Sequence, residues 1–482
     1  MTDSFDTTLI DMLWVLWAAA LVFVMQAGFL CLEAGTTRTK NAINVAMKNL
    51  ADFAIAVSVF WLVGFGVMFG TSQSGWMGSS LFGWELESTD TWLVTVFIFQ
   101  AMFCATAATI VAGAVAERMP FLGYLWTAFW IALLIYPVFG HWAWGGLLGG
   151  TPGWLAALGF IDFAGATVVH SVGGWVALAA VLVIGPREGR FQVDKPPTAF
   201  PAGNLPLAML GALFMVLGWF GFNGGSTLAL NSSVPGIIAN TMLGAVGGIL
   251  SAMLVGWRVR RYADVMYAIN GAIAGLVAVT AGAHALSLPA AFLMGGISGV
   301  LMVLASEWLL KRRIDDAVGA IPAHLVTGLW GTLALPWLAD LNRLGTSLSR
   351  FDQFTVQLLG AVVCGLWSFG TAWLLFRITR RFLPLRVSKD AEKMGLNLAE
   401  HGAKNELHQL LEHMRQHEKQ GDMRQRIDAD PFTEVGEIAA SYNRVSAALE
   451  RAVGHTRVML RNLRDGVITW QADGTLTGLN PG

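Results

Sequence analysis

The stretch Asp162-Phe-Ala-Gly-Ala-Thr-Val-Val-His170 has a counterpart far downstream, Asp316-Ala-Val-Gly-Ala-Ile-Pro-Ala-His324. In both, an acidic residue precedes a histidine by eight positions, and both continue the pattern Gly-Ala-x-x-x-His-x-Val-x-Gly, at 165–174 and at 319–328. Each histidine lies inside a long apolar run. The repeat predicts that two related halves of the chain build one buried site, as in membrane transporters whose binding sites lie between internal repeats.

The composition divides the chain into an apolar body and a hydrophilic tail. Of 482 residues, 55% are hydrophobic and only 13% are charged, whereas about a quarter of a soluble domain is charged. Residues 1–376 hold 33 charged residues, and the remaining 106 residues hold 30. The net charge of −1 gives no indication of a nucleic-acid partner. Cys31, Cys104 and Cys364 lie in apolar runs, so we interpret them as reduced packing residues.

The body is predicted to cross a membrane eleven times, because a spanning helix needs about 20 consecutive apolar residues. The predicted spans are 9–32, 48–70, 91–116, 121–140, 165–185, 204–223, 235–256, 264–282, 289–310, 320–338 and 353–376. The connections after the odd-numbered spans hold 13 of the 15 basic residues of the body. The positive-inside rule therefore places the N-terminus outside and the tail in the cytoplasm.

An ionisable residue inside a span is costly and is by default a functional candidate. We therefore expect His170 and His324 to lie within hydrogen-bond reach of each other, where they could share a proton or bind a small polar solute. Two alternatives stay open at this point. Each histidine could separately cap a helix break or bond a carbonyl, or the pair could belong to a metal site, for which no further ligand cluster is visible.

Asp162 and Asp316 stand near the starts of their helices, where a carboxylate can accept backbone N–H groups and favour the positive helix end. We expect this structural role to dominate. Because the neighbours of Asp162 are apolar, a buried functional role also stays open for it.

The chain has 20 tryptophans, and most are expected to be anchors at the membrane interface. A few polar and aromatic residues near span ends expected to face outwards could instead form a cation site, because a ring face attracts ammonium-type cations. These are Phe103, Trp144, Trp219, Phe222 and Ser226. Their convergence on one site is left open by the sequence.

The tail has three predicted parts. Residues 385–430 are expected to be a cytoplasmic segment and linker, and 431–462 a signalling helix. In that helix, apolar residues recur at a spacing that suits a parallel bundle or coiled coil; they are Val435, Ile438, Tyr442, Val445 and Leu449. An amphipathic helix lying on its own body is the alternative.

Residues 463–482 have a different character. Val467, Ile468 and Trp470, then Asp473-Gly474, then Leu476 and Leu479, predict a hairpin with a tight turn. Because two strands alone are marginally stable, we expect this stretch to be the start of a larger domain.

At these residues the chain resembles the Amt/Mep/Rh family of ammonium transporters. The motifs that carry the resemblance are 162–170, Gly218-Trp-Phe-Gly-Phe-Asn223 with Ser226, Val115-Ala-Glu-Arg118, Asn270-Gly-Ala-Ile-Ala-Gly-Leu-Val277, and the tail segment from Leu385 to Gly402. The resemblance implies an all-α membrane domain over 1–384, with two inverted five-helix repeats plus an eleventh helix. It also implies a homotrimer with one pore per subunit and no cofactor.

The resemblance further implies roles for single residues. His170 and His324 match the twin pore histidines, and Phe103 and Phe222 the stacked aromatic gate, with Trp219 beside them in the pore. Phe103, Trp144 and Ser226 match the outer ammonium site, with Asp162 as the acidic residue near it. One departure concerns Gly319, where transporters of the family usually have an acidic residue.

The tail extends the resemblance to signalling proteins. The segment 433–451 is similar to the second helix of a HAMP relay, and 463–482 to the opening of a PAS domain. Together they imply a membrane ammonium sensor in a bacterial inner membrane, which binds ammonium from the outside and signals to a cytoplasmic output domain in cis, a histidine kinase or diguanylate cyclase.

Two other function classes stay open: an ammonium channel whose tail regulates conduction, and an unrelated solute channel. No enzyme motif is visible in the chain itself. For coupling, we expect the tail carboxylates of Asp390, Glu392 and Glu400 to face the basic connections 258–261 and 311–313.

Overall fold

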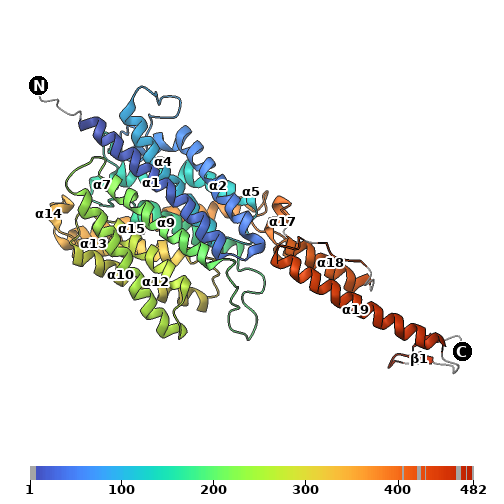
Figure 1. Ribbon diagram of the computed structural model, residues 1–482. Coiled ribbons are helices and arrows are strands. Elements are labelled where there is room, and N and C mark those ends of the chain that lie inside the picture. Colours follow the sequence, from blue (N-terminus) through green and yellow to red (C-terminus); the bar gives the residue numbers. More distant parts are fainter. Residues whose placement is uncertain are drawn as a thin grey trace, which may run out of the picture. The chain divides into compact units, whose positions relative to one another are not determined.

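The computed structural model describes residues 7–403, 406–420, 425–428, 430–462, 468–473 and 475–479. The chain divides into two compact units, 1–401 and 402–482. The larger unit is all-helical, with long helices packed side by side (Figure 1).

The first unit contains eleven successive helical stretches; a short π-helical turn interrupts two of them and begins two others. They are α1 (Thr7–Thr36); α2 (Ala42–Val59) with η2 (Phe60–Gly64) and α3 (Phe65–Phe69); α4 (Thr91–Ala114); α5 (Phe121–Trp130) with η3 (Ile131–Ile135) and α6 (Tyr136–Trp144); η4 (Ala166–Ser171) with α8 (Val172–Ile184); α9 (Leu205–Gly225); α10 (Val234–Arg260); α11 (Val265–Thr280); α12 (Leu288–Lys311); η5 (Ile321–Val326) with α13 (Thr327–Leu338); and α15 (Arg350–Thr379). Short helices η1 (Thr39–Asn41), α7 (Trp154–Ala157), α14 (Leu341–Leu344), α16 (Lys389–Met394) and α17 (Leu396–His401) complete the unit.

Nine of the described helices are long and apolar enough to cross a membrane. The two remaining predicted spans do not reach that standard on their own. One of them is α11, with only 16 residues, and the other is η5 together with α13. Both predicted segments are helical, so the helical character of all eleven is confirmed, while length and composition identify nine as spans.

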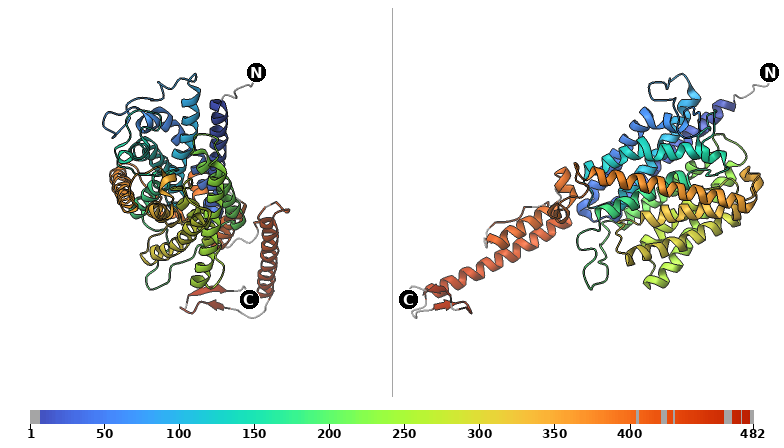
Figure 2. Two further views of the ribbon diagram at one scale, coloured as in Figure 1. Left: turned by 90° about the vertical axis from the view of Figure 1, so that its left-hand side faces the viewer. Right: turned by 180° about the vertical axis from the view of Figure 1, so that it is seen from behind.

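Helices from the two halves of the chain pack against each other. α1 runs along α9, and the turn η4 packs against η5, while α15 lies along α8 and α13 (Figure 2). Small residues permit these approaches. A Cβ added at Gly275 of α11 or at Gly295 of α12 would overlap the backbone carbonyl of Gly244 in α10, as expected for membrane helices that pack backbone to backbone.

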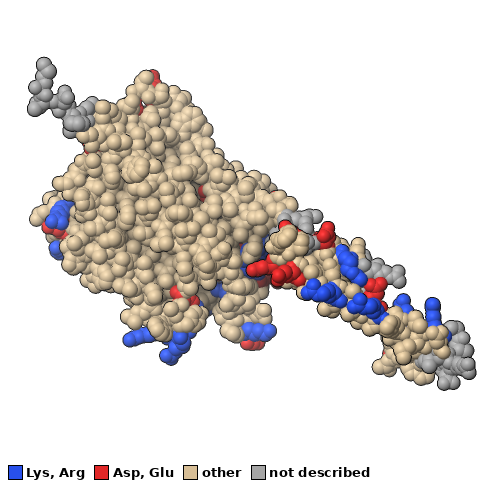
Figure 3. Space-filling model, in the orientation of Figure 1, with Lys and Arg blue, Asp and Glu red and all other residues tan. Residues whose placement is uncertain are grey.

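The basic connections gather at one end of the unit and are linked by buried ion pairs. Arg38 pairs with Glu117, and Arg187 bridges Glu117 and Asp315 at 3.3 and 2.8 Å. Arg190 also lies 3.3 Å from Asp315. These contacts tie the connections after the first, third, fifth and ninth predicted spans together. On the face seen in Figure 3, most of the body is free of charged side chains.

The second unit contains a helix pair and a hairpin. α18 (Glu406–Gln420) and α19 (Glu434–Asn462) lie side by side and run in the same direction (Figure 1). Leu410, Ile427 and Ala439 form their shared core. The hairpin pairs β1 (Ile468–Trp470) with β2 (Leu476–Leu479), which confirms the predicted hairpin; Val467 and Gly474 lie outside the described residues.

The close packing of α10 and α11 makes a specific prediction. We expect Gly275→Ala to destabilise the body by about 1–3 kcal/mol, because the new methyl group must displace backbone rather than a flexible side chain. Gly370→Ala in α15 is the matched control, since nothing lies within 4 Å of the added Cβ and alanine favours a helix. Thermal unfolding in detergent measures both; equal melting temperatures would contradict the packing argument.

Candidate functional site

The carboxylate of Asp162 holds the start of the turn that carries His170. Its two oxygens accept four backbone N–H groups, from Gly165 at 3.0 Å, Ala166 at 2.9 Å, and Thr167 and Val168 at 2.8 Å each. These are the orphan donors that every helix start leaves. Burial raises the pKa of Asp162 to about 6, although the four N–H groups act in the opposite direction. Because all four partners are donors, both oxygens act as acceptors, as in an ionised carboxylate.

The second half of the repeat has the same construction. Asp316 accepts N–H groups from Gly319 at 3.0 Å and Ile321 at 2.6 Å, immediately before the turn that carries His324. Gly165 and Gly319 have φ of 106° and 84°, a left-handed backbone that glycine adopts without a steric cost. The spacing of eight residues between acid and histidine thus corresponds to one N-terminal cap followed by one π-helical turn.

The closing glycines of the repeated pattern allow the two turns to meet. A Cβ at Gly174 would overlap the backbone of Leu325, and one at Gly328 would overlap the carbonyl of Ala166. The approach brings Nδ1 of His170 to 3.2 Å from Nδ1 of His324, which confirms the predicted hydrogen-bond reach. One imidazole must donate and the other accept, and no described residue forms a hydrogen bond with the buried Nε2 of His170.

Aromatic rings stack above this pair. Trp219 lies parallel to His170 with ring centroids 4.9 Å apart, and its Nε1 donates to Thr280 Oγ1 at 2.8 Å. Phe222 and Phe103 stack face to face with centroids 3.9 Å apart and 12° between the planes. Both phenylalanines are fully buried, and the Phe222 ring lies 5.4 Å from the His170 ring, centroid to centroid.

The remaining predicted residues lie beyond the two stacked rings. The ring of Trp144 meets Phe103 edge-on at 6.3 Å, and its Nε1 donates to the carbonyl of Asp162 at 2.6 Å. Ser226 donates its hydroxyl proton to Phe222 O at 2.8 Å, so its oxygen lone pairs stay available as acceptors. The Asp162 carboxylate, in contrast, is turned towards the η4 backbone and serves to position it.

Comparison with known proteins agrees with this arrangement. The profile described as the Ammonium Transporter Family matches residues 13–406. The chain belongs to the ammonium transporter family. It is 47% identical over 448 residues to a putative ammonium transporter of Synechocystis sp., covering 92% of this chain and 83% of that protein. It is 42% identical over 417 residues to the ammonium transporter Amt2 of Archaeoglobus fulgidus, covering 82% and 87%.

Solved structures extend the comparison. One named "Sensor Amt Protein" superposes with a TM-score of 0.80 at 42% identity, covering 82% of this chain and 98% of that one. The crystal structure of Candida albicans Mep2 gives a TM-score of 0.71 at 26% identity, with coverage of 79% and 87%. This family member is therefore a multi-pass membrane protein with the ammonium transporter fold.

Sequence reasoning missed two residues of the site. Phe29 stacks near His324 with ring centroids 6.0 Å apart, and Thr280 anchors Trp219. Phe29 is one of many apolar residues in its span, and no pattern distinguishes it. In the part of the chain that the structure describes, no three His, Cys, Asp or Glu side chains converge as a metal site would require.

The predicted contacts of the tail carboxylates were wrong. Glu400 accepts the N–H of Phe121 and the side-chain amide of Asn44, each at 2.8 Å, and Glu392 accepts the N–H of Glu188 at 2.5 Å. Phe121 N is an orphan donor at the start of α5, where the helix end is positive. The carboxylates thus bind helix starts and turns of the earlier connections, instead of the basic residues at 258–261 and 311–313.

The two capping carboxylates lead to a prediction. We expect Asp162→Asn to lower the melting temperature by at least about 5 °C, because an amide replaces an oxygen that accepts buried N–H groups. Asp264→Asn is the matched control: it caps α11 through Tyr267 N alone, and asparagine caps a helix as well as aspartate does. Equal losses of melting temperature in the two variants would contradict a larger stabilising contribution from the four-donor cap.

Proposed function

We propose that this member of the ammonium transporter family is a membrane ammonium sensor, which binds ammonium from the outside and signals through its cytoplasmic tail. The observation that carries the proposal is the parallel pair of α18 and α19 following a complete transporter-type body. This pair lies almost entirely beyond residues 13–406, which the family profile matches. The likeness to a structure named "Sensor Amt Protein", at 42% identity, supports it.

The outer site in this proposal lies where Trp144, Phe103 and Ser226 meet. An ammonium ion there would contact two ring faces or edges and donate a hydrogen bond to the Ser226 oxygen. Asp162 contributes its charge and holds Trp144 through its carbonyl. The stacked rings of Phe103 and Phe222 separate this site from the histidine pair. In that pair, no described residue forms a hydrogen bond with His170 Nε2, so this nitrogen can accept one from ammonia or ammonium.

The membrane arrangement follows the same proposal. Eleven spans in two inverted five-helix repeats agree with the pairing of α1 with α9 and of η4 with η5. The clustered basic connections mark the cytoplasmic end by the positive-inside rule, which places the N-terminus outside and the tail in the cytoplasm of a bacterial inner membrane. We further propose the homotrimer expected of the family.

The segment after α15 is the proposed link between body and tail. Lys40 Nζ donates to the carbonyls of Glu392 and Lys393 at 2.8 and 2.7 Å, and Asn397 Oδ1 accepts the N–H of Asn44 at 3.0 Å. These contacts fix α16 and α17 to the connections beside α2 and α5. A shift of those helices on ammonium binding would therefore reach the residues that lead into α18.

The helix pair supports a relay of the HAMP kind. The side-chain amide of Asn443 in α19 binds Ile427, which lies between the two helices. It donates to the Ile427 carbonyl at 2.9 Å and accepts the Ile427 N–H at 3.0 Å. Val435 and Tyr442 face α18, whereas Ile438, Val445 and Leu449 are exposed at 51%, 66% and 47%. That exposed stripe suits a second copy of the pair, and we propose that 463–482 begins a PAS-type domain.

The second candidate function is an ammonium channel with a regulatory tail, and the curated relatives named as transporters favour it. A conducting protein would show ammonium-driven current in reconstituted membranes on a solid support. A sensor would show binding, and a change in kinase or cyclase turnover of a chain joined to its output domain, at the same ammonium concentrations.

The outer site is tested by calorimetry with methylammonium. We expect Trp144→Leu and Ser226→Ala each to weaken binding by about tenfold, because a desolvated cation–π contact or a charged hydrogen bond contributes about 1–2 kcal/mol. Trp257→Leu, whose ring is 61% exposed on α10, is the control and should bind normally. Unchanged affinity in both site variants would contradict the assignment.

Coupling is tested by hydrogen exchange of residues 385–401 with and without methylammonium. We expect ligand to change the exchange of this segment in the parent protein, and Glu400→Gln to remove that change while leaving methylammonium affinity within about twofold. Asp390→Asn is the matched control, because Asp390 is exposed and makes none of the contacts that hold the segment. A ligand-independent exchange pattern in the parent would favour the channel.

A further inference from the structure

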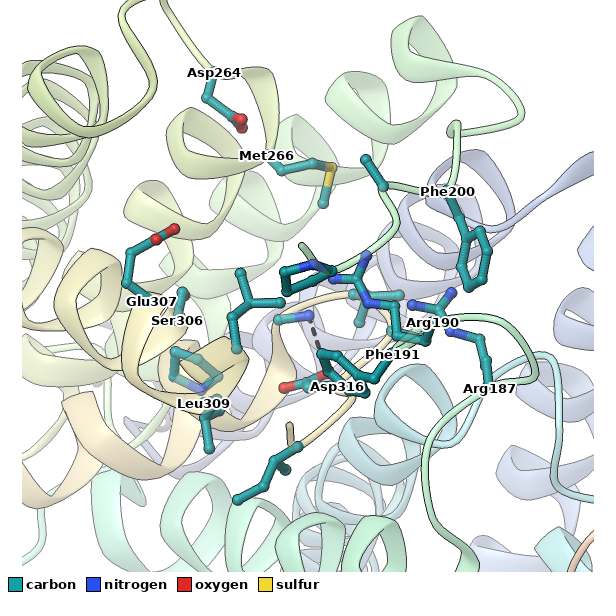
Figure 4. Close-up of a pocket in the computed structure, with 18 of the residues that line it drawn as sticks. Arg187, Arg190, Phe191, Phe200, Asp264, Met266, Ser306, Glu307, Leu309 and Asp316 are labelled. Carbon is teal, nitrogen blue, oxygen red and sulfur yellow. Dashed lines mark hydrogen bonds between the residues drawn. The ribbon is translucent and has the colours of Figure 1, made fainter. Parts of the chain in front are cut away.

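A cavity of about 630 Å³ lies at the end of the body where the basic connections gather. Figure 4 shows its walls, with Arg187, Arg190 and Phe200 on one side and Asp264, Met266 and Glu307 on the other. Pro322, two positions before His324, also lines it, so the cavity adjoins the turn of the histidine pair. Its volume lies in the range of small-molecule sites, about 300–1,000 Å³.

The charged side chains of this cavity are mostly basic. Its lining contains Arg187, Arg190, Lys195, Arg260, Lys311 and Arg313, against Asp264, Glu307 and Asp316. Just outside the lining, Asp315 accepts two hydrogen bonds from the Arg187 guanidinium, at 2.8 and 2.9 Å. Arg187 holds the pKa of Asp315 far below its ordinary value, so at neutral pH this carboxylate is charged and offsets Arg187.

The three acidic residues of the lining are already engaged within the protein. Asp264 accepts the N–H of Tyr267 at 3.0 Å, and Glu307 accepts the Tyr267 hydroxyl and Arg260, the latter at 2.5 Å. Asp316 accepts the N–H groups that begin η5. The three carboxylates therefore serve local structural contacts, and their three charges do not balance the six cations of the lining.

The basic residues divide into a fixed set and a free set. Arg187, Arg190 and Arg260 are held by carboxylates, and Arg187 and Arg190 also lie over the Phe200 ring at 4.9 and 5.8 Å. Within the described ranges, Lys195, Lys311 and Arg313 have no acidic partner. The hydrogen-bond donors of these three cationic side chains are therefore available to a ligand.

Orientation in the membrane alone does not account for this arrangement. The positive-inside rule requires basic residues near the membrane surface, and exposed residues such as Arg258, Arg380 and Arg381 meet it without lining this cavity. Here instead the loop from 187 to 202 folds so that its own cations line one cavity together with Lys311, at the end of α12, and Arg313 just after it. Convergent, partly fixed cations beside aromatic rings are the chemistry that recognises phosphate groups.

We propose that this cavity binds a phosphate-bearing anion, a ligand class that goes beyond ammonium sensing and does not depend on it. Arg187, Arg190 and Arg260 form a preorganised wall, and Lys195, Lys311 and Arg313 supply the donors that bind the ligand. The same phosphate chemistry is offered by soluble phosphate esters, such as nucleotides, and by the headgroup of an anionic phospholipid. A ligand here would stand against the turn that carries His324 and block passage at that end.

The binding test uses the purified full chain in nanodiscs. Calorimetry with pyrophosphate and with ATP tests the soluble source; native mass spectrometry of protein taken from phosphatidylglycerol against phosphatidylcholine bilayers tests the lipid source. We expect at least one source to bind, with affinity that falls as salt rises. We expect Lys195→Gln/Lys311→Gln/Arg313→Gln to weaken that binding at least about tenfold, as the loss of charged hydrogen bonds requires.

The matched control is Arg258→Gln/Arg380→Gln/Arg381→Gln, which removes the same charge from exposed positions outside the cavity and should bind within about twofold of the parent. Thermal unfolding of both triple variants verifies that the body is intact. Binding of neither source by the parent overturns the proposal, and so does equal weakening by the two triple variants, which would show adsorption to the general positive surface. The outcome is independent of whether methylammonium binds at Trp144.

Discussion

A helix that begins inside a membrane protein must satisfy its first N–H groups without water, and the Asp162 carboxylate does this for four of them at once. In lipid, each unsatisfied backbone group costs several kcal/mol, so the turn at 166–171 can exist only where such an acceptor is buried with it. Asp316 repeats the solution in the second half. The placement of both imidazoles, and of the aromatic rings stacked on them, depends on these two caps.

Charge is arranged by the same need to avoid unpaired groups in a medium of low polarity. Glu117, Arg187 and Asp315 are almost completely buried, and they are tolerated because each is paired and hydrogen-bonded. Their ion pairs join connections that are distant in the chain and fix the loop at 187–202. That loop completes the basic cavity, which is therefore a product of the same network that closes this end of the body.

The tail segment is held by a helix start as well as by basic side chains, such as Arg386, which pairs with Glu392 at 3.0 Å. The Glu400 carboxylate accepts an orphan N–H at the start of α5, where the helix dipole also stabilises its charge. A surface ion pair with a mobile arginine would contribute little to stability. Binding at a helix start also makes the contact sensitive to small movements of that helix. This sensitivity is the physical basis on which a change in the body could reach the helix pair of α18 and α19.

Local composition and short-range periodicity were enough to predict the apolar body, the helical segments, the hairpin at 468–479 and the repeated acid–histidine spacing. It also predicted that His170 and His324 would meet, since the repeat of Gly174 and Gly328 requires two equivalent turns. Only the three-dimensional packing showed that Phe29 and Thr280 support the site, and which partners Glu392 and Glu400 take. Those choices depend on contacts between residues tens to hundreds of positions apart, and no local pattern of residues encodes which distant neighbour a side chain will meet.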